Sequence, residues 1–223
     1  SRSEVIGQNG MVATSHPLAT QIGLDILKKG GTAIDAAIAA NIALGLMEPT
    51  GNGIGGDLFA IVWDAQSKQL YGLNASGPAP KNISIDYFKS KNLDKIPSYG
   101  PLPVTVPGAV DGWVKLHEKF GNQAFSSLFK PTIDYALNGF PVTETIAYYL
   151  ANSVSRFKDY PNFKEVWLKN GKTPAKGEIF KNPQLAKTLQ TIADQGRAGF
   201  YEGEVAHTMA NFIQSQGGFL SYE

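Results

Sequence analysis

The sequence has no cysteine, which excludes a disulfide framework, a thiolate metal site and a cysteine nucleophile. Histidine is scarce, and the three histidines, at positions 16, 117 and 207, share no spacing typical of metal ligands. The net charge is small as well, at +1 over 223 residues, and gives no electrostatic reason to expect nucleic acid or an anionic membrane as a partner. We therefore expect no metal, no cofactor and no nucleic-acid or membrane partner.

Long apolar runs are also missing. The most apolar stretch, residues 33–47, is interrupted by Asp35 and Asn41 and falls short of the roughly 20 residues that a membrane span needs. The first residues lack the apolar segment of a signal peptide, which leaves both cytoplasm and periplasm open. Apolar residues at 43% and charged residues at 17% are nevertheless enough for a buried core. We expect residues 1–223 to form one domain portion.

The first fifth of the chain predicts a strand and two helices. Residues 10–14 form a short apolar run typical of a strand, and Pro17 suits the first turn of a helix that ends before Gly30. Thr32 and Asp35 have the spacing of a capping box for the next helix, at about residues 33–46. That helix is apolar nearly all round, which predicts that it is buried.

A glycine-rich loop follows, and then a β-hairpin. Residues 58–63 and 70–73 read as its two strands, joined by a turn at 64–69. Six prolines then mark a long irregular stretch between residues 78 and 107. Beyond it the apolar pattern becomes helical, and the predicted helices cover residues 109–120, 125–138, 144–153, 183–195 and 203–216.

The glycine-rich loop, residues 51–56, formally matches the dinucleotide-binding pattern G-x-G-x-x-G. That function requires a strand before the loop and a helix after it, and here the order is reversed, so we reject it. One interpretation is a tight turn that uses positive φ angles. Another is that Gly55 and Gly56 bring their backbone N–H groups to a ligand, as an anion or oxyanion site would need.

Three other polar positions have a functional and a structural interpretation. Asp57 directly follows the loop and could orient a ligand amine or cap the turn. Ser15 and His16 resemble a nucleophile–base pair, but neighbours on a strand point to opposite faces, so we expect His16 to precede or cap the helix. Ser1 could act through its own terminal amine, but it reads as part of a polar leader.

Ordered sequence blocks resemble the γ-glutamyltranspeptidase family. They run over nearly the whole chain, too many in the family's order to arise by chance. The blocks are residues 10–19, 23–37, 48–49, 53–56, 79–80, 106–113, 131–140 and 200–203.

The resemblance implies an α+β fold, the αββα four-layer sandwich of N-terminal-nucleophile hydrolases, to which this chain contributes mostly helices and a hairpin. In that family a precursor cuts itself into two subunits, and the new N-terminal Thr of the small subunit attacks an amide carbonyl. This chain matches only the N-terminal part of the large subunit. It therefore lacks the catalytic nucleophile, and its partners would be the rest of that subunit and the small subunit.

One departure from the family concerns substrate choice. Members that handle glutamyl groups carry an Arg three residues before the Ala-Pro that matches residues 79–80, and that Arg grips the α-carboxylate. Ser76 stands there in this sequence, and a hydroxyl cannot replace a bidentate guanidinium. Asp57 stands where many such members have glycine, which resembles the branch of oxamate amidohydrolases and cephalosporin acylase-like proteins.

We therefore predict an autoprocessed amidohydrolase or acyltransferase that acts on a small amide outside the standard γ-glutamyl class. Its substrate-binding residues in this chain would be Ser76, Asp57, Gly55 and Gly56. Two alternatives remain open: a true glutathione-cleaving transpeptidase whose carboxylate contact comes from elsewhere, and a non-catalytic binding homologue. The sequence leaves a homo-oligomer open.

Overall fold

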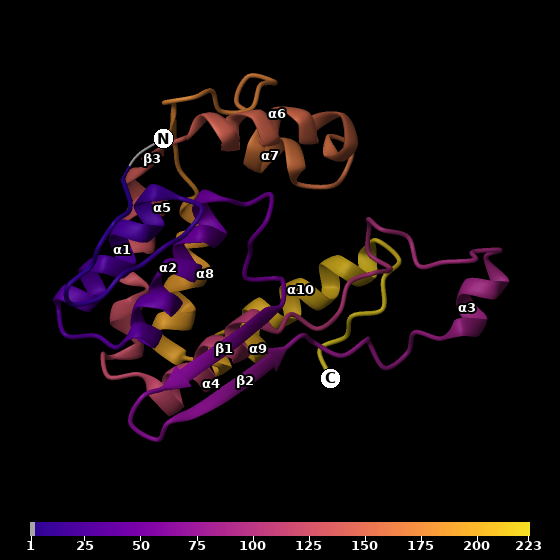
Figure 1. The fold of residues 1–223 in the computed structure, drawn as a ribbon. Coiled ribbons are helices and arrows are strands. Elements are labelled where there is room, and N and C mark those ends of the chain that lie inside the picture. Colours follow the sequence, from indigo (N-terminus) through magenta and orange to yellow (C-terminus); the bar gives the residue numbers. More distant parts are fainter. Residues whose placement is uncertain (1–2) are drawn as a thin grey trace.

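The computed structural model describes residues 3–223, and these are predominantly helical (Figure 1). Two small antiparallel sheets accompany the helices. The elements are α1 (Pro17–Lys28), α2 (Ala33–Met47), β1 (Leu58–Asp64), β2 (Gln69–Ala75), α3 (Ile85–Ser90), α4 (Ala109–Phe120), η1 (Phe125–Leu128), α5 (Lys130–Asn138), β3 (Phe140–Pro141), α6 (Glu144–Phe157), α7 (Phe163–Trp167), β4 (Ile179–Phe180), α8 (Pro183–Gln195), α9 (Ala198–Tyr201) and α10 (Gly203–Ser215).

Helix α2 lies in the main hydrophobic core, as its all-round apolar sequence predicts. Its small alanines let neighbouring helices approach closely, and Ile42 and Met47 are almost fully buried. Helices α1, α4, α5 and α8 supply the other walls of this core. Trp113 of α4 reaches across to α2, where its indole N–H donates to the Asn41 side chain over 2.8 Å.

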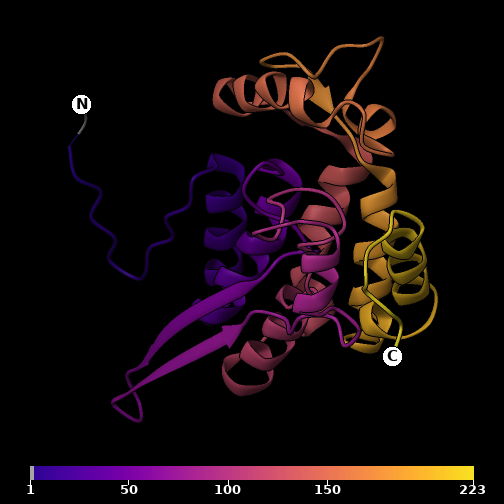
Figure 2. The ribbon, with the colours of Figure 1, turned by 90° about the vertical axis from the view of Figure 1, so that its right-hand side faces the viewer.

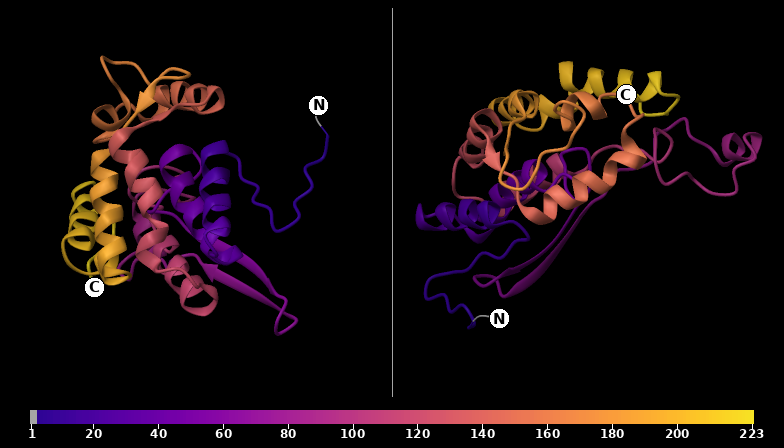
Figure 3. Two further views of the ribbon diagram at one scale, coloured as in Figure 1. Left: turned by 90° about the vertical axis from the view of Figure 1, so that its left-hand side faces the viewer. Right: turned by 90° about the horizontal axis from the view of Figure 1, so that it is seen from above.

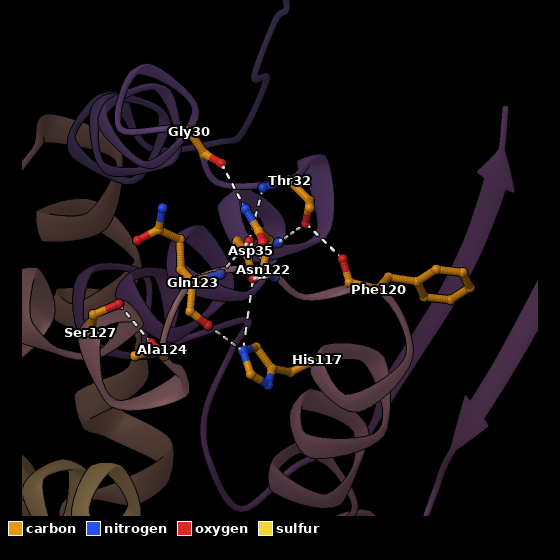
Figure 4. Close-up of polar contacts among 9 residues, drawn as sticks. All are labelled: Gly30, Thr32, Asp35, His117, Phe120, Asn122, Gln123, Ala124 and Ser127. Carbon is orange, nitrogen blue, oxygen red and sulfur yellow. Dashed lines mark hydrogen bonds and ion pairs between the residues drawn. The ribbon is translucent and has the colours of Figure 1, made fainter. Parts of the chain in front are cut away.

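Both helix starts predicted from the sequence are confirmed. His16 Nδ1 accepts from the Leu18 N–H at 3.3 Å and caps α1, with Pro17 in the first turn. Thr32 and Asp35 form the predicted capping box of α2. Asp35 does more than cap, because it also accepts from the backbone N–H groups of Asn122 and Gln123 at 3.0 and 3.2 Å (Figure 4).

The predicted hairpin is formed by β1 and β2 and is slightly longer than expected. It projects from the helices (Figure 2), and its register places Leu58 opposite Ala75 and Asp64 opposite Gln69. Residues alternate between half-buried and exposed along β1, as the period of a strand requires. The exposed face carries Phe59, Ile61 and Trp63, so this side of the hairpin is apolar but open.

Two further parts stand away from the main core. The excursion between β2 and α4 carries the short helix α3, which extends far to one side (Figure 3, right). Helices α6 and α7 lie together at another edge (Figure 1) and share a small second core built around Val142, Ile146 and Leu150. The strand pair β3–β4 joins this part to the rest of the chain.

Several predicted elements need correction. The strand at residues 10–14 does not form, although Val12 and Thr14 are half-buried in the alternating pattern of a strand, because no strand lies beside this segment within residues 3–223. The predicted helix at 125–138 is divided into η1 and α5, with Pro131 in the first turn of α5. Short elements α3, α7, α9, β3 and β4 were missed, since four- to six-residue helices and two-residue strands show almost no period.

In the part of the chain that the structure describes, no helix combines the length and the apolar character needed to cross a bilayer. Residues 3–223 also contain no group of three or more His, Asp or Glu side chains placed to hold a metal ion. Ser1, considered above as a nucleophile, lies outside the described residues.

Candidate active-site edge

The open end of the β1–β2 hairpin brings the predicted site residues together. Leu58 of β1 pairs with Ala75 of β2. Asp57, just before β1, and Ser76, just after β2, are therefore the next residues beyond that pair at the open end of the hairpin. The Gly77 N–H points to Asp57 Oδ1 at 3.4 Å, a long hydrogen bond that joins the two ends. Both Asp57 and Ser76 are exposed, so an incoming ligand can reach either side chain.

Ser76 has a defined backbone position. Its N–H donates to the Asn74 side chain at 2.9 Å, an Asx-type contact that turns the chain at the end of β2. Gly77 follows, and a β-carbon there would overlap the Val106 carbonyl group. Gly108 is restricted in the same way, since a β-carbon would overlap the Ala75 carbonyl. The glycines thus allow residues 106–108 to lie directly against the end of β2.

The glycine-rich loop lines a cavity of about 410 Å³ beside this edge. The Gly56 carbonyl accepts from the N–H groups of Gly108 and Ala109, both at 3.0 Å, and so ties the loop to the start of α4. The Gly56 N–H donates to the Gly53 carbonyl at 3.2 Å and belongs to a turn. The cavity is lined by residues 49–53, 55–57, Asn41, Ala109 and Trp113.

The positive-φ interpretation of this loop is wrong. None of its glycines, at positions 51, 53, 55 and 56, is among the described residues with positive φ. A β-carbon at position 51, 53 or 55 would meet no atom of the described chain within 4 Å. The packing within residues 3–223 therefore does not require glycine at these three positions, and the space above them is open.

Ser15 and His16 do not form a nucleophile–base pair in the structure. The Ser15 hydroxyl donates to Glu48, and the His16 ring is buried and turned to the start of α1. His16 Nε2 has no hydrogen-bond partner in the described chain. Burial lowers the pKa of His16 below its usual value, and the nearby Glu48 carboxylate opposes that shift. His16 therefore serves as a buried cap.

A second polar group fixes the start of α4 next to this edge. The Tyr201 hydroxyl donates to the Pro107 carbonyl at 2.7 Å and accepts from the Asp111 N–H at 3.0 Å. Burial is the main reason that the pKa of Tyr201 is raised. Arg197 Nε donates to the Asp111 carboxylate at 2.7 Å. Sequence reasoning missed this group because its members lie about 90 residues apart in the chain.

Comparisons with known proteins show what the whole chain is similar to. The cephalosporin acylase of Bacillus halodurans superposes on the whole of this chain with a TM-score of 0.94 and 43% identity, and the chain covers 42% of that structure. The glutathione hydrolase-like YwrD proenzyme of Bacillus subtilis is 35% identical over 98% of this chain and 42% of its own length. The oxamate amidohydrolase proenzyme of Klebsiella pneumoniae is 33% identical over 96% of this chain and 41% of its own length.

The fold is therefore that of the N-terminal-nucleophile hydrolases that include acylases and transpeptidases, as the sequence predicted. The family profile described as gamma-glutamyltranspeptidase matches residues 19–223. The chain belongs to the γ-glutamyltranspeptidase family. It spans about two fifths of the length of the relatives just described.

Proposed function

We propose that the complete protein is an autoprocessed amide hydrolase whose nucleophile lies outside residues 1–223. Its substrate would bind at the open end of the hairpin, with an acyl group outside the γ-glutamyl class. Membership in the γ-glutamyltranspeptidase family supports the reaction type. The names of two relatives, an oxamate amidohydrolase and a cephalosporin acylase, support an acyl group other than glutamyl.

The observation that carries this proposal is the meeting of Asp57 and Ser76 at one edge. They are 19 positions apart in the sequence, yet the hairpin register sets them opposite each other beside the glycine-lined cavity. An exposed carboxylate can hold a substrate amine or amide N–H, and a hydroxyl can donate to a carbonyl oxygen. Both groups are neutral or anionic, so neither of these two residues offers a fixed cation for an α-carboxylate.

The two described arginines make their contacts elsewhere. The Arg197 guanidinium pairs with Asp111 and lies over the Tyr201 ring, 4.7 Å from its centre. Arg156 donates to the Tyr99 hydroxyl, in the segment between β2 and α4. A γ-glutamyl carboxylate bound near Ser76 would meet neither of these guanidiniums, and loss of such a partner reduces affinity by roughly 10²-fold.

The open face of the hairpin supports a partner from the same precursor. Phe59, Ile61 and Trp63 are 67, 81 and 62% exposed on one side of the two-stranded sheet. An isolated hairpin is marginally stable, and a row of large apolar side chains normally packs against another layer. We infer that the remaining large-subunit segment and the small subunit cover this face.

The proposal is tested with the full-length processed protein. We expect γ-glutamyl-p-nitroanilide to be cleaved poorly, whereas oxamate or another small non-glutamyl amide is turned over. Substituting Ser76→Arg should raise kcat/KM for γ-glutamyl-p-nitroanilide by about tenfold or more, since it restores a guanidinium–carboxylate contact. Ser67→Arg is the matched control, because Ser67 lies in the turn at the other end of the same hairpin.

Efficient cleavage of the γ-glutamyl anilide by the unmodified protein would refute the specificity proposal and favour a glutathione hydrolase. A denaturing gel that shows one uncut chain, together with no turnover of any amide, would favour a non-catalytic homologue instead. Equal effects of Ser76→Arg and Ser67→Arg would remove Ser76 from the substrate site.

A further inference from the structure

A second cleft, larger than the cavity at the glycine loop, lies between the α6–α7 part and the body of the molecule. Its volume is about 740 Å³, within the range typical of small-molecule sites. The α6–α7 part forms one wall, and residues 99–101 and the end of α10 form the other. Six aromatic residues contribute to the lining: Tyr99, Phe157, Tyr160, Phe163, Trp167 and Phe212.

The wall formed by α6 and α7 is held in place by its own packing. The Trp167 ring stacks on Phe180 with the planes 9° apart and the centres 5.3 Å apart. Asn162 adopts the left-handed conformation, at φ 65°, in the turn between the two helices. Phe157 lies edge-on to Tyr99 at 5.3 Å and connects this wall to the opposite one. Trp167 and Phe157 are thus each packed against another aromatic ring.

Arg156 is the only charged residue that lines the cleft within the described chain. Its Nη1 donates to the Tyr99 hydroxyl at 2.9 Å, and its guanidinium lies 5.0 Å from the centre of the Tyr99 ring. Among the described residues no carboxylate forms an ion pair with it. One hydrogen bond uses one of its five N–H donors, so the others can bind an anion.

These features together select a kind of ligand. Aromatic side chains favour a flat, apolar group, which they contact by stacking or edge-to-face packing. A guanidinium that is positioned by Tyr99 and lacks a counter-ion favours a carboxylate, which it can bind through two parallel hydrogen bonds. The structural alternative is that Arg156 only stabilises the contact with Tyr99 through its cation–π geometry. That role needs neither the open volume nor the other aromatic residues.

We propose that this cleft binds a small aromatic carboxylate, with the ring among the aromatic side chains and the carboxylate on Arg156. The proposal is separate from the amide hydrolysis proposed above, since it concerns binding and requires no turnover. The cleft and the glycine-loop cavity share Pro49 and Thr50 in their linings, so the two sites adjoin.

Direct binding to the full-length protein tests the proposal, with phenylacetate as the probe and isothermal titration calorimetry as the measurement. Phenylacetamide keeps the ring without the charge, and acetate keeps the charge without the ring. We expect phenylacetate to bind roughly tenfold or more tightly than either one. Arg156→Gln should lower its affinity to about that of phenylacetamide. Lys158→Gln is the matched control, an exposed cation two residues further along that does not line the cleft.

Trp167 gives an independent readout, because it lines the cleft and ligand binding should quench its fluorescence. Quenching by phenylacetate should disappear in Trp167→Phe and weaken in Arg156→Gln. The proposal is overturned if phenylacetate binds no better than phenylacetamide, if Arg156→Gln and Lys158→Gln behave alike, or if a correctly folded protein binds none of the three probes.

Discussion

The helical core and the β1–β2 hairpin differ in how completely this chain buries them. Helix α2 is enclosed by other helices of the same chain, and Ile42 keeps only 1% of its surface exposed. Ile61 of β1 is 81% exposed, although its side chain is identical. The same apolar chemistry therefore has two outcomes, because the helices meet their neighbours within residues 3–223 and one face of the hairpin does not.

The difference in burial means that the part of the chain that contributes most to stability is not the part that carries the candidate site. The core supplies the free energy of folding, since burial of apolar surface is the dominant favourable contribution. The hairpin contributes less, but its open end holds Asp57 and Ser76. The candidate site thus lies on an element that residues 3–223 bury only on one face.

Asp35→Ala should strongly destabilise the helical core. The Asp35 carboxylate is fully buried and accepts from the N–H groups of Thr32, Asn122 and Gln123 (Figure 4). Its removal leaves these donors without partners, which should lower the free energy of unfolding by about 3 kcal/mol or more. Urea denaturation measures the change. Asp134→Ala, which removes only a surface pair with Lys130, should cost no more than about 0.5 kcal/mol.

A matched pair of isoleucine substitutions compares the two regions directly. Ile42→Ala should lower the free energy of unfolding by about 2–5 kcal/mol, because it leaves a cavity in the core. Ile61→Ala should cost no more than about 1 kcal/mol in a chain ending at residue 223. Equal costs would show that the hairpin face is covered within this chain. In the full-length processed protein we expect the cost of Ile61→Ala to rise, as the proposed partner layer predicts.

The sequence predicted the helices of the core better than the strand at residues 10–14. Helices α4 and α8 have the predicted bounds, and the ends of α2 and α10 differ by one residue, because their caps and apolar period are local signals. The strand at residues 10–14 failed because a strand depends on a partner that local sequence does not describe. Thr14 and its neighbours keep the alternating burial without any ladder.

The candidate site could be predicted in its residues but not in its arrangement. Ser76 and Asp57 were predicted as site residues from the family resemblance. That they lie close together across the hairpin depends on the strand register, which is fixed by the turn between Asp64 and Gln69. The positive-φ interpretation of the loop glycines was wrong, since the pattern alone does not reveal backbone angles, whereas a role of Gly55 and Gly56 in ligand binding stays a prediction. The sequence analysis drew nothing from Gly77 and Gly108, although each allows a close approach between distant segments.

The smallest effect concerns pH and the point where the N-terminal segment enters the core. His16 is buried and its pKa is lowered, chiefly by burial, so the folded protein holds this proton less tightly than the unfolded chain. The neutral ring therefore supports stability fully above the unfolded pKa of about 6.5, and that support is lost as the pH falls through the folded pKa. His16→Asn keeps a capping side chain but removes the titrating group. Its stability, measured by urea denaturation between about pH 7.5 and 5, should fall less steeply than that of the unmodified chain. Equal slopes in His16→Asn and the unmodified chain would show that His16 does not govern the acid response.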